Sequence, residues 1–200
     1  MNTRKIVFYL PEGFADWEGA FLMAELSEAK RDFVTVSETG NKVHSIGRLR
    51  VQPDAALKNF SSDQIEMLIL IGSDSWQDPE QNKAAIDLAK QLLKQGTYVA
   101  AICGATTALA RAGEFEERRH TSNDLGMLKQ IVPTYRGEQK YVQKLACTDG
   151  HLITASGIGP LEFSFEVLKA LRIYSENKLS QWYAMHKNGV MPSMEYWTSI

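Results

Sequence analysis

The 200-residue chain has few cysteines, little net charge and no long apolar run. Its two cysteines, Cys103 and Cys147, are too few for a disulfide framework and fit a reducing cytoplasm. A formal net charge of −2 supplies no general attraction to nucleic acid or to an anionic membrane. No apolar run approaches the roughly 20 residues of a membrane span, and the polar start shows no signal peptide. We therefore expect a cytoplasmic protein that binds neither nucleic acid nor membranes.

Metal-binding patterns are also missing. The four histidines and two cysteines are scattered and show no spacing typical of metal ligands. We therefore predict neither a metal site nor a cofactor. A hydrophobic content of 44% with 23% charged residues is ordinary for one globular domain, with room for a short extension.

Apolar runs and helical patterns alternate through the first half of the chain. We predict strands at 5–10, 33–36, 67–71 and 98–102, and helices at 17–30 and 79–95. Asp16 is the expected N-cap of the first helix, and the second turns Ala84, Ala85, Leu88 and Leu92 inward. This order predicts a three-layer α/β sandwich, with a mostly parallel central sheet between helices.

Two hairpins and further helices complete the expected fold. The hairpins lie at 43–51 and 141–154, the second with Asp149-Gly150 at its tip. Helices are predicted at 124–130 and 161–171. Before the second of these, Gly157 and Gly159 either cradle an anion or allow a loop to pack tightly on the sheet.

The last residues form a helical extension rich in aromatic side chains. We divide the chain into a domain at 1–172 and an extension at 173–200, with a helix at 180–187. Trp182, Trp197 and their apolar neighbours present too much surface to leave in water. We expect the extension to bury them against the domain or against another subunit.

Cys103 stands where the predicted strand at 98–102 turns directly into a helix that ends at Gly113. Ala101, Gly104 and Ala105 are small enough for the sharp corner that this requires. Such a corner is typical of a nucleophile elbow, and the helix N-terminus would favour the thiolate. The alternative is a buried cysteine at an ordinary strand end.

Glu18 should lie at the same edge of the sheet, at the start of the first helix. A carboxyl group beside a thiol can share a proton with it, and burial would raise the pKa of that carboxyl. The alternative is a glutamate favoured only by the helix dipole. Trp17, the residue before Glu18, is a candidate to line a binding site, although core packing is the default for tryptophan.

Four motifs together resemble the ThiJ/PfpI superfamily: Ala100–Ala105, Ala15–Glu18, Leu70–Ser73 and Ile153–Pro160. The resemblance covers residues 4–172. That superfamily includes intracellular PfpI-type peptidases and the parkinsonism-associated deglycase, and is related to class I glutamine amidotransferase domains. It implies a flavodoxin-like fold and assembly as a homodimer or larger homo-oligomer.

The resemblance also assigns roles to individual residues. Cys103 matches the nucleophile, and Glu18 matches the acidic residue that contacts it. The N–H of Gly104, with an N–H of Gly72 or Ser73, matches the pocket that holds a developing negative oxygen. Ser73 stands where relatives often carry a second glycine, so we expect this loop to be tighter or oriented differently.

The histidine of the family is missing. PfpI-type peptidases carry it directly after the cysteine, where this chain has Gly104. The deglycase-like branch takes it from a later segment, and Asn123 falls in that place here. His120 is nearby, but three residues away in an extended segment it faces the opposite side. Without an imidazole, Cys103 lacks the usual base for acyl transfer, which weakens a hydrolase interpretation.

Three functions remain open on the sequence. The first is a cysteine-dependent, hydrolase-like enzyme that acts on a peptide or on a small molecule such as an amide, a glyoxal or a glycated adduct. The second is a cysteine redox sensor or stress-response protein, which needs no histidine. The third is a protein that binds a metabolite without chemistry.

Overall fold

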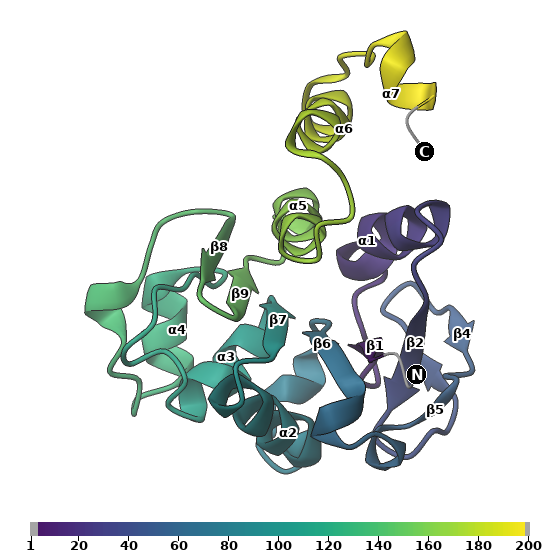
Figure 1. The fold of residues 1–200 in the computed structure, drawn as a ribbon. Helices are drawn as coiled ribbons and strands as arrows, with labels where there is room; N and C mark the ends of the chain where they lie inside the picture. Colours follow the sequence, from purple (N-terminus) through teal and green to yellow (C-terminus); the bar gives the residue numbers. More distant parts are fainter. Residues whose placement is uncertain (1–3, 199–200) are drawn as a thin grey trace.

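The computed structural model describes residues 4–198 and contains a seven-stranded, mostly parallel sheet (Figure 1). Its strand order is β5-β2-β1-β6-β7-β9-β8, and its final pair, β9 and β8, is antiparallel. The strands are β1 Lys5–Tyr9, β2 Phe33–Ser37, β5 Ala55–Ala56, β6 Ile65–Leu70, β7 Tyr98–Ile102, β8 Ala146–Asp149 and β9 Leu152–Ala155. A separate antiparallel pair is formed by β3 Val43–His44 and β4 Arg50–Val51.

Helices cover both faces of the sheet (Figure 1). On one face lie α2 (Lys83–Lys94) and α3 (Gly104–Arg111), and on the other α1 (Asp16–Glu28) and α5 (Pro160–Ala170). The remaining helices are α4 Leu125–Ile131, α6 Glu176–Asn188 and α7 Met194–Thr198, with 3-10 turns at Leu57–Asn59, Ser62–Gln64, Asp74–Gln77 and Glu138–Lys140. The predicted three-layer sandwich is confirmed.

The apolar run in β6 shows why a central parallel strand needs no polar face. Leu68 joins the core cluster beneath α2 that also contains Leu92. Its neighbour Ile69 points the other way and joins the core that contains Phe163 of α5. Both residues are fully buried. Successive side chains of this strand therefore enter the two cores on opposite faces of the sheet, and both positions need an apolar residue.

Three local predictions need correction. Ala15, not Asp16, is the N-cap of α1, because the Asp16 carboxylate instead accepts the Gly47 N–H at 2.7 Å. Helix α2 begins four residues later than predicted, at Lys83; Ala84 is exposed and Ala89 is buried on its inner face. The short strand β5, which pairs with β2, was not expected because two alanines carry no strand pattern.

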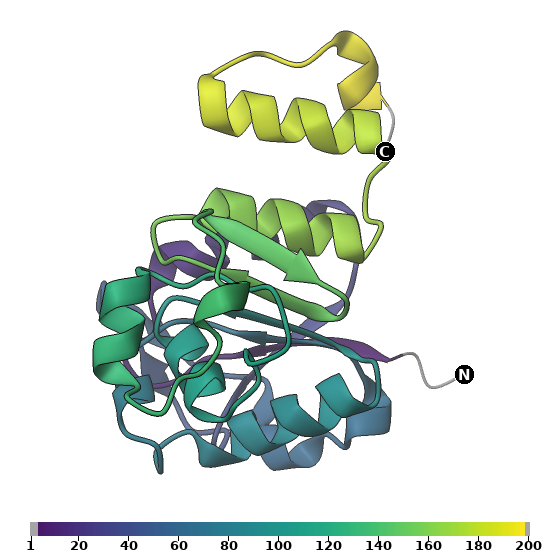
Figure 2. The same ribbon diagram turned by 90° about the vertical axis from the view of Figure 1, so that its left-hand side faces the viewer.

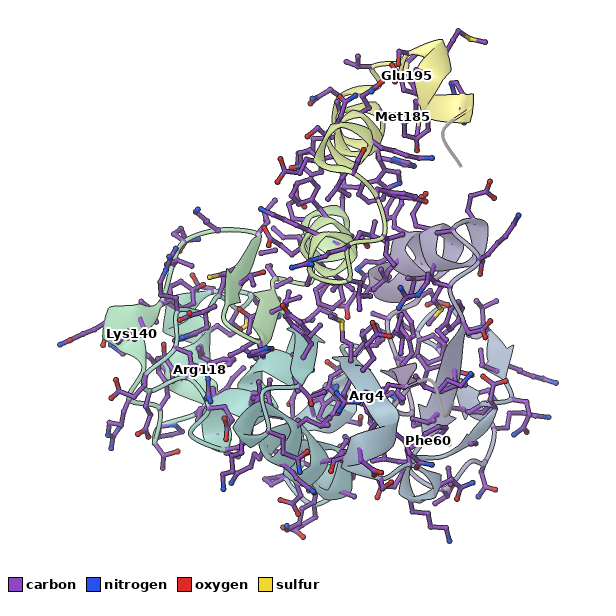
Figure 3. The ribbon with its side chains drawn as sticks, viewed as in Figure 1. Arg4, Phe60, Arg118, Lys140, Met185 and Glu195 are labelled. Atoms are coloured by element: carbon purple, nitrogen blue, oxygen red, sulfur yellow. The ribbon has the colours of Figure 1, made fainter. Side chains whose placement is uncertain are left out.

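The C-terminal extension stacks on α5 rather than on the sheet (Figure 2). Trp182 of α6 is fully buried, and its ring packs edge-on against Phe21 of α1 at 6.4 Å. Trp197 of α7 is 48% exposed in the single chain, so it is not buried against the domain, and its burial against another subunit stays a prediction. Figure 3 labels Met185 and Glu195 in this part, which stands apart from the sheet. The division at residue 172 stays a prediction.

None of the helices between residues 4 and 198 has the length and apolar character that crossing a bilayer requires. Within the same residues, no cluster of three or more histidine, cysteine, aspartate or glutamate side chains could hold a metal ion.

Candidate active site

Cys103 occupies a strained corner between β7 and α3. Strand β7 ends at Ile102 and helix α3 begins at Gly104, so one residue makes the whole turn. Its backbone has φ 57° and ψ −124°, a conformation that a side chain disfavours. The Cys103 N–H donates to the carbonyl of Ala155 in β9 at 3.0 Å, which fixes the corner to the sheet. Such strain is characteristic of functional positions and costs on the order of 1–3 kcal/mol.

This strain predicts an unusual stability difference. Cys103→Gly should be more stable than Cys103→Ala by about 1 kcal/mol, because glycine relieves the positive φ and only part of that gain is offset by unfolded-chain entropy. Urea unfolding of the two variants measures the difference. At a position of α3 with ordinary helical geometry, glycine should be less stable than alanine. Ala108→Gly should therefore be less stable than the parent chain. An alanine variant at 103 as stable as the glycine variant would show that the corner is unstrained.

Glu18 is fully buried and lies next to the Cys103 thiol. Its Oε2 accepts the Gly72 N–H at 2.6 Å, while Oε1 has no hydrogen-bond partner among residues 4–198. A Cβ placed on Gly157 would lie 2.8 Å from Cys103 Sγ and 3.1 Å from Glu18 Oε1. The thiol and the free carboxyl oxygen therefore border the same point above Gly157, and both can reach one small molecule.

Burial changes the acidity of both groups. It raises the pKa of Glu18 to about 7, against the hydrogen bond from Gly72 and the contact with the Cys103 thiol, which lower it. Burial, reinforced by the nearby Glu18 charge, raises the pKa of Cys103 to about 11. The raised carboxyl pKa was expected, but the expected thiolate was not found. The helix N-terminus is outweighed by desolvation, so the sulfur carries its proton at neutral pH.

Asn123 reaches the sulfur from the segment after α3. Its Nδ2 donates to Cys103 Sγ at 3.4 Å, and its Oδ1 accepts the Gly157 N–H at 2.8 Å. An amide cannot take up a proton at neutral pH, so Asn123 offers the sulfur a hydrogen bond and not a base.

His120 is not brought to the sulfur. It is fully buried, with Nε2 2.6 Å from the Tyr135 hydroxyl and Nδ1 2.7 Å from the Arg118 carbonyl. Its ring stacks on Phe115 with centroids 4.2 Å apart. Burial lowers the pKa of His120, which keeps the ring neutral in this cluster.

The structure reduces the number of candidate N–H donors for an oxyanion. The Gly72 N–H is already bonded to Glu18. The Ser73 hydroxyl donates to the Glu12 carbonyl at 2.6 Å and accepts the Ser75 N–H, which fixes the loop. Gly104 packs so closely that a Cβ there would lie 2.5 Å from the Ser73 carbonyl oxygen. The Gly104 N–H is directed at the Cys103 sulfur, and no hydrogen bond within residues 4–198 occupies the Ser73 N–H, so these two N–H groups stay the candidate donors for a developing negative oxygen.

Trp17 borders the site instead of packing in the core. Its indole is 48% exposed, and Nε1 donates to the Gly157 carbonyl at 3.0 Å. Ile158, the next residue, is 81% exposed. Together these side chains place an accessible apolar surface beside the sulfur.

Gly157 is the site residue that sequence reasoning missed. Its N–H binds Asn123, its carbonyl binds Trp17, and its missing side chain leaves room for the thiol. At Gly159 a Cβ would come within 2.8 Å of the Leu145 carbonyl. Of the two interpretations of this glycine pair, tight packing is the one that these contacts support. The sequence signals were the glycine pair itself and its place in the family motif Ile153–Pro160, and neither indicated contact with the sulfur.

Comparison with known proteins agrees with the resemblance seen in the motifs. The profile of the DJ-1/PfpI family matches residues 4–170. The protein named uncharacterized protease YoaZ from Bacillus subtilis is 37% identical over 195 residues, covering 94% of this chain and 92% of that protein. The protein named deglycase PfpI from Pyrococcus furiosus is 22% identical over 157 residues, covering 78% and 92%.

A solved structure of a thiJ/pfpI family protein from Bacillus anthracis superposes with a TM-score of 0.88. It is 37% identical and covers 98% of this chain, while this chain covers 94% of it. Fold, sequence and motif order thus agree over nearly the whole length. The chain belongs to the DJ-1/PfpI family.

Proposed function

We propose that this protein is a cysteine-dependent enzyme that acts on small electrophilic carbonyl compounds, with an α-oxoaldehyde as its simplest substrate. The observation that carries the proposal is the free Oε1 of Glu18 facing the Cys103 sulfur beside Gly157. A carboxyl group with a pKa of about 7 can both accept and return a proton at neutral pH. It takes the place of the missing histidine.

The reaction begins with addition of the thiol to the aldehyde carbon. A C–S bond forms as the S–H proton passes to Glu18, and the carbonyl oxygen becomes negative near the N–H groups of Ser73 and Gly104. Proton return to that oxygen gives a hemithioacetal. Glu18 then takes the proton from the former aldehyde carbon and returns it to the neighbouring carbonyl carbon through an enediol, while the hydroxyl proton of the hemithioacetal passes to the oxygen of that neighbouring carbonyl. Water hydrolyses the resulting thioester to a 2-hydroxy acid. The thiol is regenerated without an external oxidant or reductant.

Peptide hydrolysis places heavier demands on the same residues. Expelling an amine from a tetrahedral intermediate requires a general acid at the leaving nitrogen, which an imidazole supplies in cysteine peptidases. In this chain Asn123 holds the corresponding place, and His120 is bonded to Tyr135. Addition to an aldehyde needs no such leaving group, so it suits the residues present.

A redox role receives less support from the same contacts. The Asn123 amide could donate to an oxidised sulfur, which favours such a role. Peroxide, however, reacts with thiolate, and a thiol with a pKa of about 11 holds little thiolate at neutral pH. The enzyme is therefore the better proposal.

Methylglyoxal and casein distinguish the carbonyl enzyme from the peptidase. The protein should convert methylglyoxal to lactate, followed by an enzymatic lactate assay, while release of casein peptides should stay at the level of a blank. Cys103→Ala, purified in the same way, is the matched blank for both assays. Equal lactate formation by the parent chain and Cys103→Ala would end the proposal, and cysteine-dependent release of casein peptides alone would replace it with a peptidase.

A further inference from the structure

A cavity that the candidate active site does not use lies between strand β8 and the end of helix α5. It has a volume of about 450 Å³ and opens at the edge of the sheet, where Figure 2 shows β8 with α5 above it. This volume lies within the range of about 300–1,000 Å³ of small-molecule sites. Neither Cys103 nor Glu18 lines the cavity, so it is separate from the candidate active site.

The lining of this cavity is strongly basic. Arg119, Lys144, Lys169 and Arg172 contribute four cationic side chains, against one carboxylate from Glu166. Among the ion pairs of residues 4–198, none includes these four cations. The chain as a whole carries a net charge of −2, so the concentration of positive charge here is local.

Unpaired cations that converge on one cavity repel one another, and an anion between them removes that repulsion. Outside the cavity, by contrast, Lys187 of α6 pairs with Glu162 of α5. Helix α5 therefore supplies a carboxylate to a cation that does not line the cavity. The side chains that face the cavity thus lack the compensation that their neighbours have.

Polar groups on the wall and floor are already oriented. The Thr148 hydroxyl donates to Glu166 Oε2 at 2.7 Å, which holds that carboxylate against β8. The thiol of Cys147 is 5% exposed and contributes to the lining. Burial raises the pKa of Cys147; the charges of Arg119 and Lys144 act against that rise, and those of Asp149 and Glu166 add to it.

We propose that this basic cavity binds a small molecule that carries phosphate groups. Two guanidinium groups supply forked donors for phosphate oxygens, and two ammonium groups add point charges. The fixed Glu166 carboxylate can accept a hydroxyl of the same ligand. A concave site of this volume fits a small molecule, whereas a nucleic acid would need a basic surface that extends beyond the cavity.

Calorimetric titration with pyrophosphate at constant ionic strength tests this site. The parent chain should bind it saturably, and Arg119→Gln/Arg172→Gln should bind it at least tenfold more weakly. Arg48→Gln/Arg50→Gln makes the same charge change on the distant β3–β4 pair and should bind within twofold of the parent chain. Glucose 6-phosphate and orthophosphate, run in parallel, show whether one phosphate group suffices.

Absence of saturable binding of all three phosphates in the parent chain would overturn the proposal, as would an equal loss in both double variants. A short DNA duplex that binds more tightly than pyrophosphate would replace the small molecule with nucleic acid. Methylglyoxal turnover should be the same in the parent chain and in Arg119→Gln/Arg172→Gln, because the cavity shares no residue with the elbow. The result at this cavity therefore stands apart from the result at Cys103.

Discussion

Glu18→Gln should reduce kcat/KM for methylglyoxal about 1,000-fold, within the range of about 10²–10⁴ for loss of a general base. The glutamine has nearly the same shape, and its carbonyl oxygen can still accept the Gly72 N–H that now binds Oε2 at 2.6 Å. What is lost is the ability of Oε1 to take the proton from the Cys103 thiol. Steady-state lactate formation measures the effect, and circular dichroism checks that the fold is intact.

The pH profile gives the same variant a second readout. Since the base form of Glu18 is required and its pKa is about 7, kcat/KM of the parent chain should fall tenfold for each pH unit below 7. The residual activity of Glu18→Gln should lack this acidic limb. A variant that keeps the limb, or that keeps full activity, would remove Glu18 from the mechanism. Asp16→Asn, two residues earlier in the chain at a carboxylate bonded to Gly47, serves as the control and should keep the limb.

Stability should depend on pH in the opposite direction. The folded state holds the Glu18 proton more tightly than the unfolded chain, whose glutamate pKa is near 4.5. The resulting stabilisation is present below pH 4.5 and is lost as the pH rises through 7. Between these values the parent chain should lose about 3 kcal/mol of unfolding free energy that Glu18→Gln does not lose. Urea unfolding at pH 4.5 and 8 measures this difference.

The corner at Cys103 and the placement of Glu18 could be foreseen because both depend on local pattern and strand order. A strand that meets a helix without a loop forces the turn, and parallel strands bring their carboxyl ends to one edge. The acidity of the thiol could not be foreseen in the same way. It depends on how much of the sulfur is desolvated, which is decided by loops from distant parts of the chain.

The segment at 120–123 also shows which contacts the sequence could not predict. Their spacing indicated opposite faces for His120 and Asn123, and the structure does separate them. No sequence pattern, however, identified Tyr135 as the partner of His120 or Gly157 as the partner of Asn123. Both contacts join loops, where hydrogen bonds are not set by a periodic pattern. Asp16 is a similar case, since its carboxylate bonds to Gly47 across the chain instead of capping its own helix.

Gly157→Ala should reduce methylglyoxal turnover about as strongly as the loss of Glu18, about 1,000-fold. The added methyl group would lie 2.8 Å from Cys103 Sγ and 3.1 Å from Glu18 Oε1, both too close for ordinary contact. Either the two groups separate or the Gly157 loop moves away with its bonds to Asn123 and Trp17. A displacement of about 1 Å can cost 10²-fold in rate, and here two reacting groups are displaced together.

Gly19→Ala is the matched control for this substitution, because it adds the same methyl group next to Glu18 in the chain. There the Cβ would meet the ends of the Ile71 and Met23 side chains at 3.3 Å, and these can shift. Alanine also favours the helix more than glycine does, so this variant should keep its stability and most of its turnover. If instead Gly157→Ala retained turnover, the thiol and the carboxyl would not need the space above Gly157. The proton transfer that replaces the missing histidine would then have to follow another path, because no other carboxyl group among residues 4–198 has been found bordering that sulfur.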